Sequence, residues 1–216
     1  MILILDTSSS KMQVILCQKD GKFTCCSDVF DKHQKHLLPQ IEKLLASQNT
    51  TIDKVDGYAV VIGPGSFTGI RLAVATAKGF GQIMNRKVLP INMLDLLSFK
   101  LSNKAKEGYA VFEKCTSSRV YMGCKQNGEY ISKTLDNSDA IDYVTSHNLQ
   151  PFGFDMDKIG DYQISLLSLE AKDYVDYVLS KSAQDYLPAQ KVEPLYMALS
   201  QAEEELIKRQ NKEGAK

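Results

Sequence analysis

The sequence predicts an α/β fold of two related lobes, and three observations support this prediction. Short apolar runs alternate with segments of helical periodicity, which is typical of strands that alternate with helices. Asp20-Gly21 and Asn127-Gly128 each separate two such runs, and both dipeptides favour a tight hairpin turn. The two hairpins lie roughly 108 residues apart in similar surroundings, which indicates a duplicated unit of three strands and a helix. Chance similarity between two common hairpins is the alternative.

The first lobe is expected to contain three consecutive strands followed by alternating helices and strands. Strands are predicted at residues 2–6, 12–18 and 22–30. Ile41, Leu44 and Leu45 recur at helical spacing and predict a helix around them. A strand at 55–62, a helix from Ser66 to about residues 81–85, a strand at 87–91 and a helix at 93–101 complete the lobe.

The second copy begins with an apolar strand at 109–112 and repeats the pattern of the first. Thr116-Ser117-Ser118 then leads to Cys124, as Thr7-Ser8-Ser9 leads to Cys17. Helices are predicted at 139–146 and 170–182, and Pro188 and Pro194 bracket an irregular segment. The predicted boundaries are 1–105 for the N-terminal lobe, 106–197 for the C-terminal lobe, and 198–216 for a terminal helix and frayed tail near the lobe junction.

Composition predicts a cytoplasmic globular protein. The 26 basic and 26 acidic side chains cancel, which argues against nucleic-acid binding by this chain alone, because phosphate affinity requires clustered cations. The five cysteines are odd in number and form no C-x-x-C pair, as expected for reduced thiols. The apolar run before Asp6 is too short for the core of a signal peptide, and no run is long enough to span a membrane.

The glycine-rich stretch GPGSFTGIRL, from Gly63 to Leu72, matches none of three catalytic templates. It lacks the lysine of a P-loop, and it has one residue too many for the dinucleotide pattern. It also lacks the glycines that flank the serine of a nucleophile elbow. We therefore interpret it as the start of a helix capped by Ser66 or Thr68, with an anion site near Arg71 as the alternative.

The helix after this stretch carries a ridge of small residues that recur every fourth position: Gly69, Ala73, Ala77 and Gly81. A ridge without large side chains lets another element approach closely. Two interpretations remain open, namely packing within the protein and docking of a partner. Ile70, Val74 and Phe80 are offset from the ridge and can supply the face toward the core.

Two further groups of polar residues are candidate sites. His33 and His36 are spaced for a shared metal, but no third ligand accompanies them, which favours surface or interface histidines and predicts no metal site. Asp6-Thr7-Ser8 follows a strand and could face a phosphate-bound cation, or it could satisfy its own turn. The second copy has Glu113 at the corresponding place, so a site with two aspartates is doubtful.

Four segments together resemble the TsaB family, also called YeaZ: ILILDTSSS at the start, the segment 33–39, GPGSFTGIRLAVATAKG, and Glu193-Pro194-Leu195-Tyr196. The resemblance implies the two-lobed actin/hexokinase/Hsp70-like (ASKHA) fold, built from duplicated βββαβα units. The chain departs from the family's pattern at residues 114–121, where only Val120-Tyr121 matches that pattern, and at Met197-Ala198. These changes put a polar role of the second lobe in doubt.

The resemblance also implies a role in making N6-threonylcarbamoyladenosine in tRNA. The chain would be a non-catalytic companion of the transferase TsaD, with the ATPase TsaE as a further partner, a possible homodimer, and tRNA contacts only through the complex. ATP and metal are expected in those partners, and no cofactor is expected here. Asp6, Thr7 and Ser8 would be a vestigial nucleotide site. The partner interface implied by the resemblance comprises His33, Ser66, Phe67, Gly69, Ile70, Arg71, Ala73, Val74, Ala77, Lys78 and Gly81.

Replacing Ala77 by arginine is expected to leave the fold intact and to abolish pairing, if the ridge docks a partner. The alternative function is an ATP-dependent, kinase-like enzyme of the same fold that uses Asp6 and the loop at Gly63.

Overall fold

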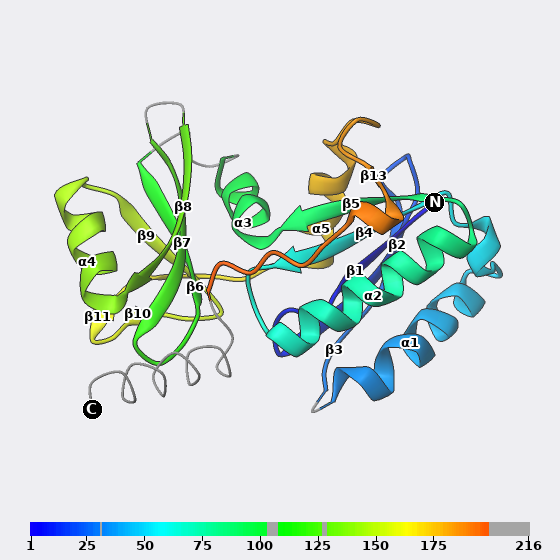
Figure 1. The fold of residues 1–216 in the computed structure, drawn as a ribbon, viewed down its shortest axis with the longest axis horizontal. Coiled ribbons are helices and arrows are strands. Elements are labelled where there is room, and N and C mark those ends of the chain that lie inside the picture. Colours follow the sequence, from blue (N-terminus) through cyan, green and yellow to red (C-terminus); the bar gives the residue numbers. More distant parts are fainter. Residues whose placement is uncertain (31, 103–107, 127–128, 199–216) are drawn as a thin grey trace, which may run out of the picture.

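The first lobe is built on a six-stranded sheet (Figure 1) with the strand order β13-β5-β4-β1-β2-β3. The computed structural model describes residues 1–30, 32–102, 108–126 and 129–198. Strands β1 (Ile2–Asp6), β2 (Lys11–Cys17) and β3 (Phe23–Val29) run antiparallel, whereas β4 (Gly57–Gly63) and β5 (Lys87–Asn92) continue the sheet parallel to β1. Gly21 turns the predicted hairpin with φ of 84°, a value that few other residues tolerate.

Two helices cover one face of this sheet. Helices α1 (His33–Ser47) and α2 (Phe67–Ile83) contact each other, and the short helix η1 (Ile52–Lys54) follows α1. Helix α1 buries Leu37, Ile41, Leu44 and Leu45 against the sheet, as its spacing predicts. It begins before this stripe and continues through Pro39, which is exposed.

The second lobe repeats the arrangement on a five-stranded sheet with the order β12-β9-β6-β7-β8. Strands β6 (Tyr109–Lys114), β7 (Arg119–Gln126) and β8 (Glu129–Asp136) are antiparallel. Helix α4 (Asn137–Ser146) follows. Strand β9 (Gln150–Phe154) pairs parallel to β6, and β12 (Ser165–Leu167) pairs parallel to β9. The shared order of the first five strands confirms the predicted duplication and the ASKHA fold class.

The second copy departs from the predicted βββαβα unit between β9 and β12. A hairpin of β10 (Lys158–Ile159) and β11 (Tyr162–Gln163) stands where the first lobe has α2. The connection is shorter than the dozen or so residues that a helical crossover requires. The second lobe therefore has no counterpart of α2 among the described residues.

The remaining two helices lie at the lobe junction, and each contacts strands of the other lobe. Helix α3 (Met93–Ser102) follows β5 but contacts β6 and β7, and α5 (Ala171–Leu179) follows the second sheet but contacts β2 and β3. One buried apolar cluster consequently contains Ile4, Leu96, Val111 and Tyr174, from both halves of the chain. The junction between the lobes is core rather than a solvent-filled gap.

The chain returns to the first lobe before it ends. Strand β13 (Leu187–Pro188) pairs with β5, and helix η2 (Ala189–Lys191) contacts α2. Val192 is buried in the core of the first lobe. The segment from α5 to η2, which lies within the predicted second lobe of 106–197, thus contacts elements of the first lobe. The terminal helix predicted at 198–208 lies, apart from residue 198, outside the described residues.

Residues 193–197, which we call the strap, then run from the first lobe to the second (Figure 1). At the first lobe, the backbone N–H of Leu195 in the strap donates to the Ile62 carbonyl of β4 at 2.8 Å. At its far end, the Thr134 hydroxyl on β8 donates to the Met197 carbonyl at 2.7 Å. The strap thus forms a further connection between the two lobes.

All five cysteines carry free thiols, and Cys17 and Cys124 are buried. None of the helices in the described parts of the chain combines the length and the apolarity needed to span a membrane.

Candidate functional site

The glycine-rich loop joins β4 to α2 and packs against the turn after β1. The Ser66 hydroxyl accepts a hydrogen bond from the Gly69 N–H at 3.3 Å, which confirms the predicted helix cap. Gly65 has φ of 140°, and a Cβ at this position would lie 2.7 Å from the Ser8 carbonyl oxygen. The Ser66 N–H also donates to that oxygen at 2.7 Å. Glycine is required here because the loop touches the Ser8 backbone.

Asp6 ends β1 beneath this loop and is fully buried. Its Oδ1 accepts from the Ser8 N–H at 2.7 Å and from the Ser8 hydroxyl at 2.6 Å. Its Oδ2 accepts from the Tyr174 hydroxyl on α5 at 2.6 Å. Burial raises the pKa of Asp6, and the hydrogen bonds from Ser8 and Tyr174 act in the opposite direction. Both carboxylate oxygens are thus occupied by the protein itself.

Glu113 on β6 lies in the same buried region and is only 6% exposed. Its Oε1 lies 3.1 Å from the position of a Cβ at Gly65, and no described residue is hydrogen-bonded to its Oε2. Burial, with the charges of Asp6 and Asp155 as smaller causes, raises the pKa of Glu113 well above its ordinary value. The structure therefore brings together the two acids that the sequence placed at corresponding positions, but it seals them between the lobes.

This geometry disfavours the kinase-like alternative. A carboxylate that positions a phosphate-bound cation needs an oxygen that the cation can reach. Asp6 has no exposed surface, and Tyr174 from helix α5 covers one of its oxygens. Sequence reasoning did not identify Tyr174 as a partner of Asp6, because its place in the apolar stripe of α5 gave no signal of a polar contact.

The small-residue ridge of α2 packs inside the protein. Its four members are buried, together with Ile70 and Val74. A Cβ at Gly69 would lie 1.8 Å from the Thr7 carbonyl oxygen, and the Thr7 hydroxyl donates to the Gly69 carbonyl at 2.6 Å. At the other end, a Cβ at Gly81 would lie 2.7 Å from the Ala189 Cβ. Internal packing, one of the two interpretations of this ridge, is the arrangement in the structure.

The structure thus places six residues of the expected partner interface inside the first lobe, namely Gly69, Ile70, Ala73, Val74, Ala77 and Gly81. The expectation for Ala77 changes with it, because this side chain is fully buried. An arginine there would have to enter the core of the first lobe, so it would damage the fold rather than leave it intact. The helical spacing of small residues could not reveal which neighbour they face.

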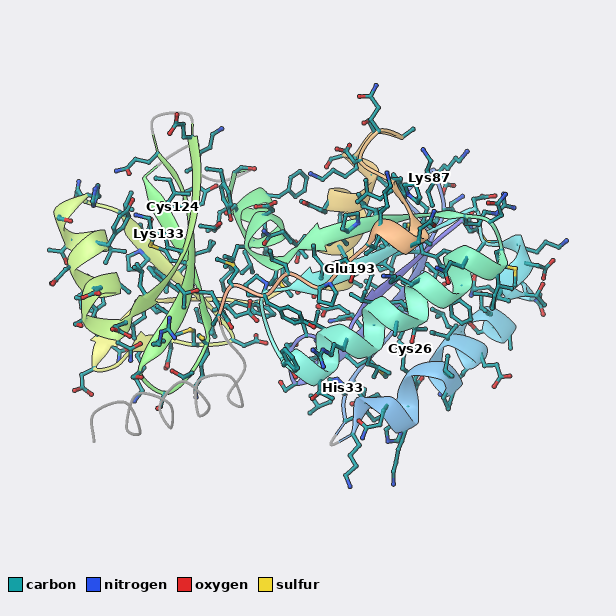
Figure 2. All side chains as sticks on the ribbon, in the orientation of Figure 1. Cys26, His33, Lys87, Cys124, Lys133 and Glu193 are labelled. Carbon is teal, nitrogen blue, oxygen red and sulfur yellow. The ribbon has the colours of Figure 1, made fainter. Side chains whose placement is uncertain are left out.

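A second face of α2 contacts the strap. The Lys78 ammonium pairs with the Glu193 carboxylate at 2.6 Å, and Figure 2 shows Glu193 beside the helix. The Arg71 Nε–H donates to the Tyr196 hydroxyl at 2.7 Å. The sequence placed Arg71 and Lys78 in a partner interface but did not predict these contacts across more than 100 residues of chain.

A third face of α2 is open. Thr68, Leu72, Ala75, Gly79 and Ile83 recur three or four residues apart, and each is exposed or half-buried. Ile83 is 78% exposed, and a Cβ at Gly79 would meet no atom within 4 Å. The spacing of this second stripe was present in the sequence, but only the Gly69 ridge was considered as a docking surface from the sequence.

Helix α1 extends this open surface. An apolar groove of about 730 Å³ lies between α1, η1 and the Phe80 side chain of α2, and exposed Leu38 stands on its rim. A smaller hollow of about 440 Å³ lies where α1 and α2 begin, lined by Ser8, Ser9, Ser10, Lys32 and His33 among others. Ser66 and Phe67, also predicted for the interface, are exposed at this end of α2.

Of the two histidines, His33 lines the smaller hollow (Figure 2 labels His33). His33 Nε2 lies 3.1 Å from the Ser10 carbonyl oxygen, and the His36 ring stacks on Phe30 at 4.2 Å between centroids. No group of three or more histidine, cysteine or acidic residues is arranged for a metal ion in the described parts of the chain.

Comparison with known proteins identifies similar sequences. The family model of TsaD, tRNA N6-adenosine threonylcarbamoyltransferase, matches residues 27–175. The chain is 34% identical over 98 residues to the tRNA threonylcarbamoyladenosine biosynthesis protein TsaB of Haemophilus influenzae, which covers 45% of this chain and 41% of that protein. It is 33% identical over 84 residues to the protein of the same name from Buchnera aphidicola subsp. Baizongia pistaciae, covering 39% and 38%. The matched segments thus span less than half the length of these relatives.

Comparison of structures shows a shared fold over nearly the whole chain. A Pseudomonas aeruginosa protein described as uncharacterized, with similarity to peptidase YEAZ, superposes with a TM-score of 0.72 at 23% identity and covers 91% of this chain and 99% of its own. A structure of YeaZ from the same organism has a TM-score of 0.68 at 24% identity and covers 90% and 98%.

Proposed function

We propose that this chain is a non-catalytic subunit of the system that makes N6-threonylcarbamoyladenosine in tRNA. The chain belongs to the TsaB family, and the family model of TsaD matches its residues 27–175. In this role it binds and stabilises a TsaD-like transferase. The names of the similar proteins support the pathway, and the buried contacts of Asp6 support the non-catalytic role.

The non-catalytic role rests on one observation: hydrogen bonds from within the chain engage both carboxylate oxygens of Asp6. Ser8 and Tyr174 use both carboxylate oxygens, and the residue has no exposed surface. Opening this site to a phosphate-bound cation would break a buried hydrogen bond and separate α5 from the first sheet. ATP and metal therefore belong to the partner subunits in this proposal, and Asp6, Thr7 and Ser8 are structural.

The open face of α2 is the proposed docking surface. Ala75 and Gly79 have little or no side chain, so a partner helix can approach α2 closely along this stripe. Leu72 and Ile83 on α2 and Leu38 on α1 offer apolar surface that a partner would remove from water. Stronger contact with the competent form of the transferase than with other forms would shift its population toward the competent form.

The wider assembly follows from the same proposal. A second copy of this chain would use the same open face when the transferase is absent, which makes homodimer and heterodimer mutually exclusive. A TsaE-like ATPase and the tRNA would join through the complex, in the cytoplasm. The chain's balanced charge agrees with tRNA contact that depends on the other subunits.

Sedimentation velocity of the chain alone and mixed with the TsaD-like subunit tests this proposal. We expect a heavier mixed species that Ala75→Arg abolishes, because Ala75 is exposed on the open face and its replacement leaves the core untouched. Ala183→Arg, the same change at an exposed position away from α2, is the matched control. Pairing that survives Ala75→Arg would refute this surface. Saturable Mg-ATP binding by the isolated chain, lost in Asp6→Ala, would support the kinase-like alternative instead.

A further inference from the structure

A stacked arrangement of three side chains stands at the edge of the open face of α2. The Arg71 guanidinium carbon lies 3.9 Å from the centroid of the Phe67 ring and 5.6 Å from that of Tyr196. The two rings lie 4.9 Å apart, and the Tyr196 hydroxyl accepts from Arg71 Nε at 2.7 Å. Phe67 is 36% and Tyr196 45% exposed, so this platform reaches the surface.

The platform holds the guanidinium in place but does not neutralise its charge. The strap gives Lys78 a carboxylate from Glu193, whereas it gives Arg71 only a neutral phenol. Among the described residues, no carboxylate forms an ion pair with Arg71. Of the five N–H donors of an arginine, one is used by Tyr196, and the planar fork of the other nitrogens suits a carboxylate.

The two helix starts near the platform supply no acidic side chain from their first turns. Helix α2 contains no acidic residue, although its first turn is the place where acids stabilise a helix. Lys32 precedes the neighbouring helix α1, which also has no acid in its first turn. An anion brought by a partner to Arg71 would therefore meet no acidic side chain of α2 or of the first turn of α1.

We propose that the platform of Phe67, Arg71 and Tyr196 receives a carboxylate of the partner protein and fixes the register in which that partner lies along α2. This inference rests on the function proposed above and names a determinant of that pairing. Arginine and tyrosine are enriched among the residues that dominate protein interfaces, and here their orientation is set before binding. A protein carboxylate is favoured over an RNA phosphate because the platform adjoins an apolar helix face and has few neighbouring cations, whereas RNA affinity depends on many.

The test measures the affinity of the full chain for the TsaD-like subunit at low and high salt. Arg71→Gln removes the charge, and Arg86→Gln, at an exposed position just beyond the other end of the helix, is the matched control with the same change of charge. We expect Arg71→Gln to weaken pairing by at least about thirtyfold, as when one partner of a buried interfacial charge pair is removed. We also expect a smaller salt dependence, and little change in Arg86→Gln.

The Tyr196→Phe variant separates orientation from charge. It keeps the ring and removes the hydroxyl that holds Arg71, so we expect a loss of affinity smaller than that of Arg71→Gln. Equal affinities for Arg71→Gln and Arg86→Gln, with normal wild-type pairing, would overturn the inference and leave the proposed function standing. Unchanged pairing with weaker binding of tRNA by the complex would also overturn it, in favour of a phosphate. Absence of pairing by the wild-type chain would overturn both proposals.

Discussion

Two glycines ten residues apart on α2 are expected to respond to alanine in opposite directions. At Gly69 a Cβ would lie 1.8 Å from the Thr7 carbonyl oxygen, whereas ordinary contact needs about 3.5 Å. The start of α2 would have to move by more than 1 Å or so, which would break the bond from the Thr7 hydroxyl to the Gly69 carbonyl. Overpacking and the lost hydrogen bond together should lower the free energy of unfolding by about 2–4 kcal/mol.

At Gly79 the same substitution meets open space. Alanine is the better helix former, so Gly79→Ala should raise the free energy of unfolding by about 0.5–1 kcal/mol. If a partner helix approaches α2 there, the added methyl group should also weaken pairing, so the variant would be more stable alone and weaker in the complex.

Urea unfolding followed by circular dichroism measures both variants against the wild type. We expect Gly69→Ala to unfold at clearly lower urea than Gly79→Ala, with similar slopes. The reasoning about the close contact between α2 and Thr7 would be refuted by a Gly69→Ala variant within about 0.5 kcal/mol of the wild type, the range of ordinary surface substitutions. A gain in pairing by Gly79→Ala would contradict close helix approach at that position.

Two further predictions concern the buried acids between the lobes. The folded chain raises the pKa of Glu113 well above the ordinary value of 4.5. Above pH 4.5 the unfolded state therefore releases a proton that the native state still holds. The contribution of Glu113 to the free energy of unfolding consequently falls as the pH rises from below 4.5 toward the folded pKa. The stability of Glu113→Gln relative to the wild type should therefore increase across that range in urea unfolding at a series of pH values, and a difference independent of pH would contradict it. Tyr174→Phe removes the donor to Asp6 Oδ2 and should cost about 1–3 kcal/mol, because a buried acceptor loses its partner. Thermal unfolding of Tyr174→Phe measures this cost, and Tyr162→Phe, at a 39% exposed position, is the control. Equal effects of the two substitutions would show that the Tyr174 hydroxyl contributes nothing to stability.

Local chemistry made several features predictable from the sequence. The turn at Gly21, the cap at Ser66 and the apolar stripe of α1 each depend on residues close together in the chain. The duplication was visible because both copies carry similar turn dipeptides, and equal strand order in the two sheets confirms it. The missing helix of the second copy was less visible, because a short connection leaves no marker of its own.

The tertiary structure decided which residues are available for function. A helix with small residues on two stripes gives the same signal whether a stripe faces a sheet or solvent, and only the position of Thr7 and Ala189 shows that the Gly69 ridge is buried. The contacts of Asp6 with Tyr174 and of Arg71 with Tyr196 join positions 168 and 125 residues apart. The sequence by itself determined the elements of residues 1–102 and the family resemblance, because these follow from neighbouring residues and from motifs. The open face of α2, the sealed acids and the strap depended on long-range packing, since burial is a property of the folded chain and not of any segment.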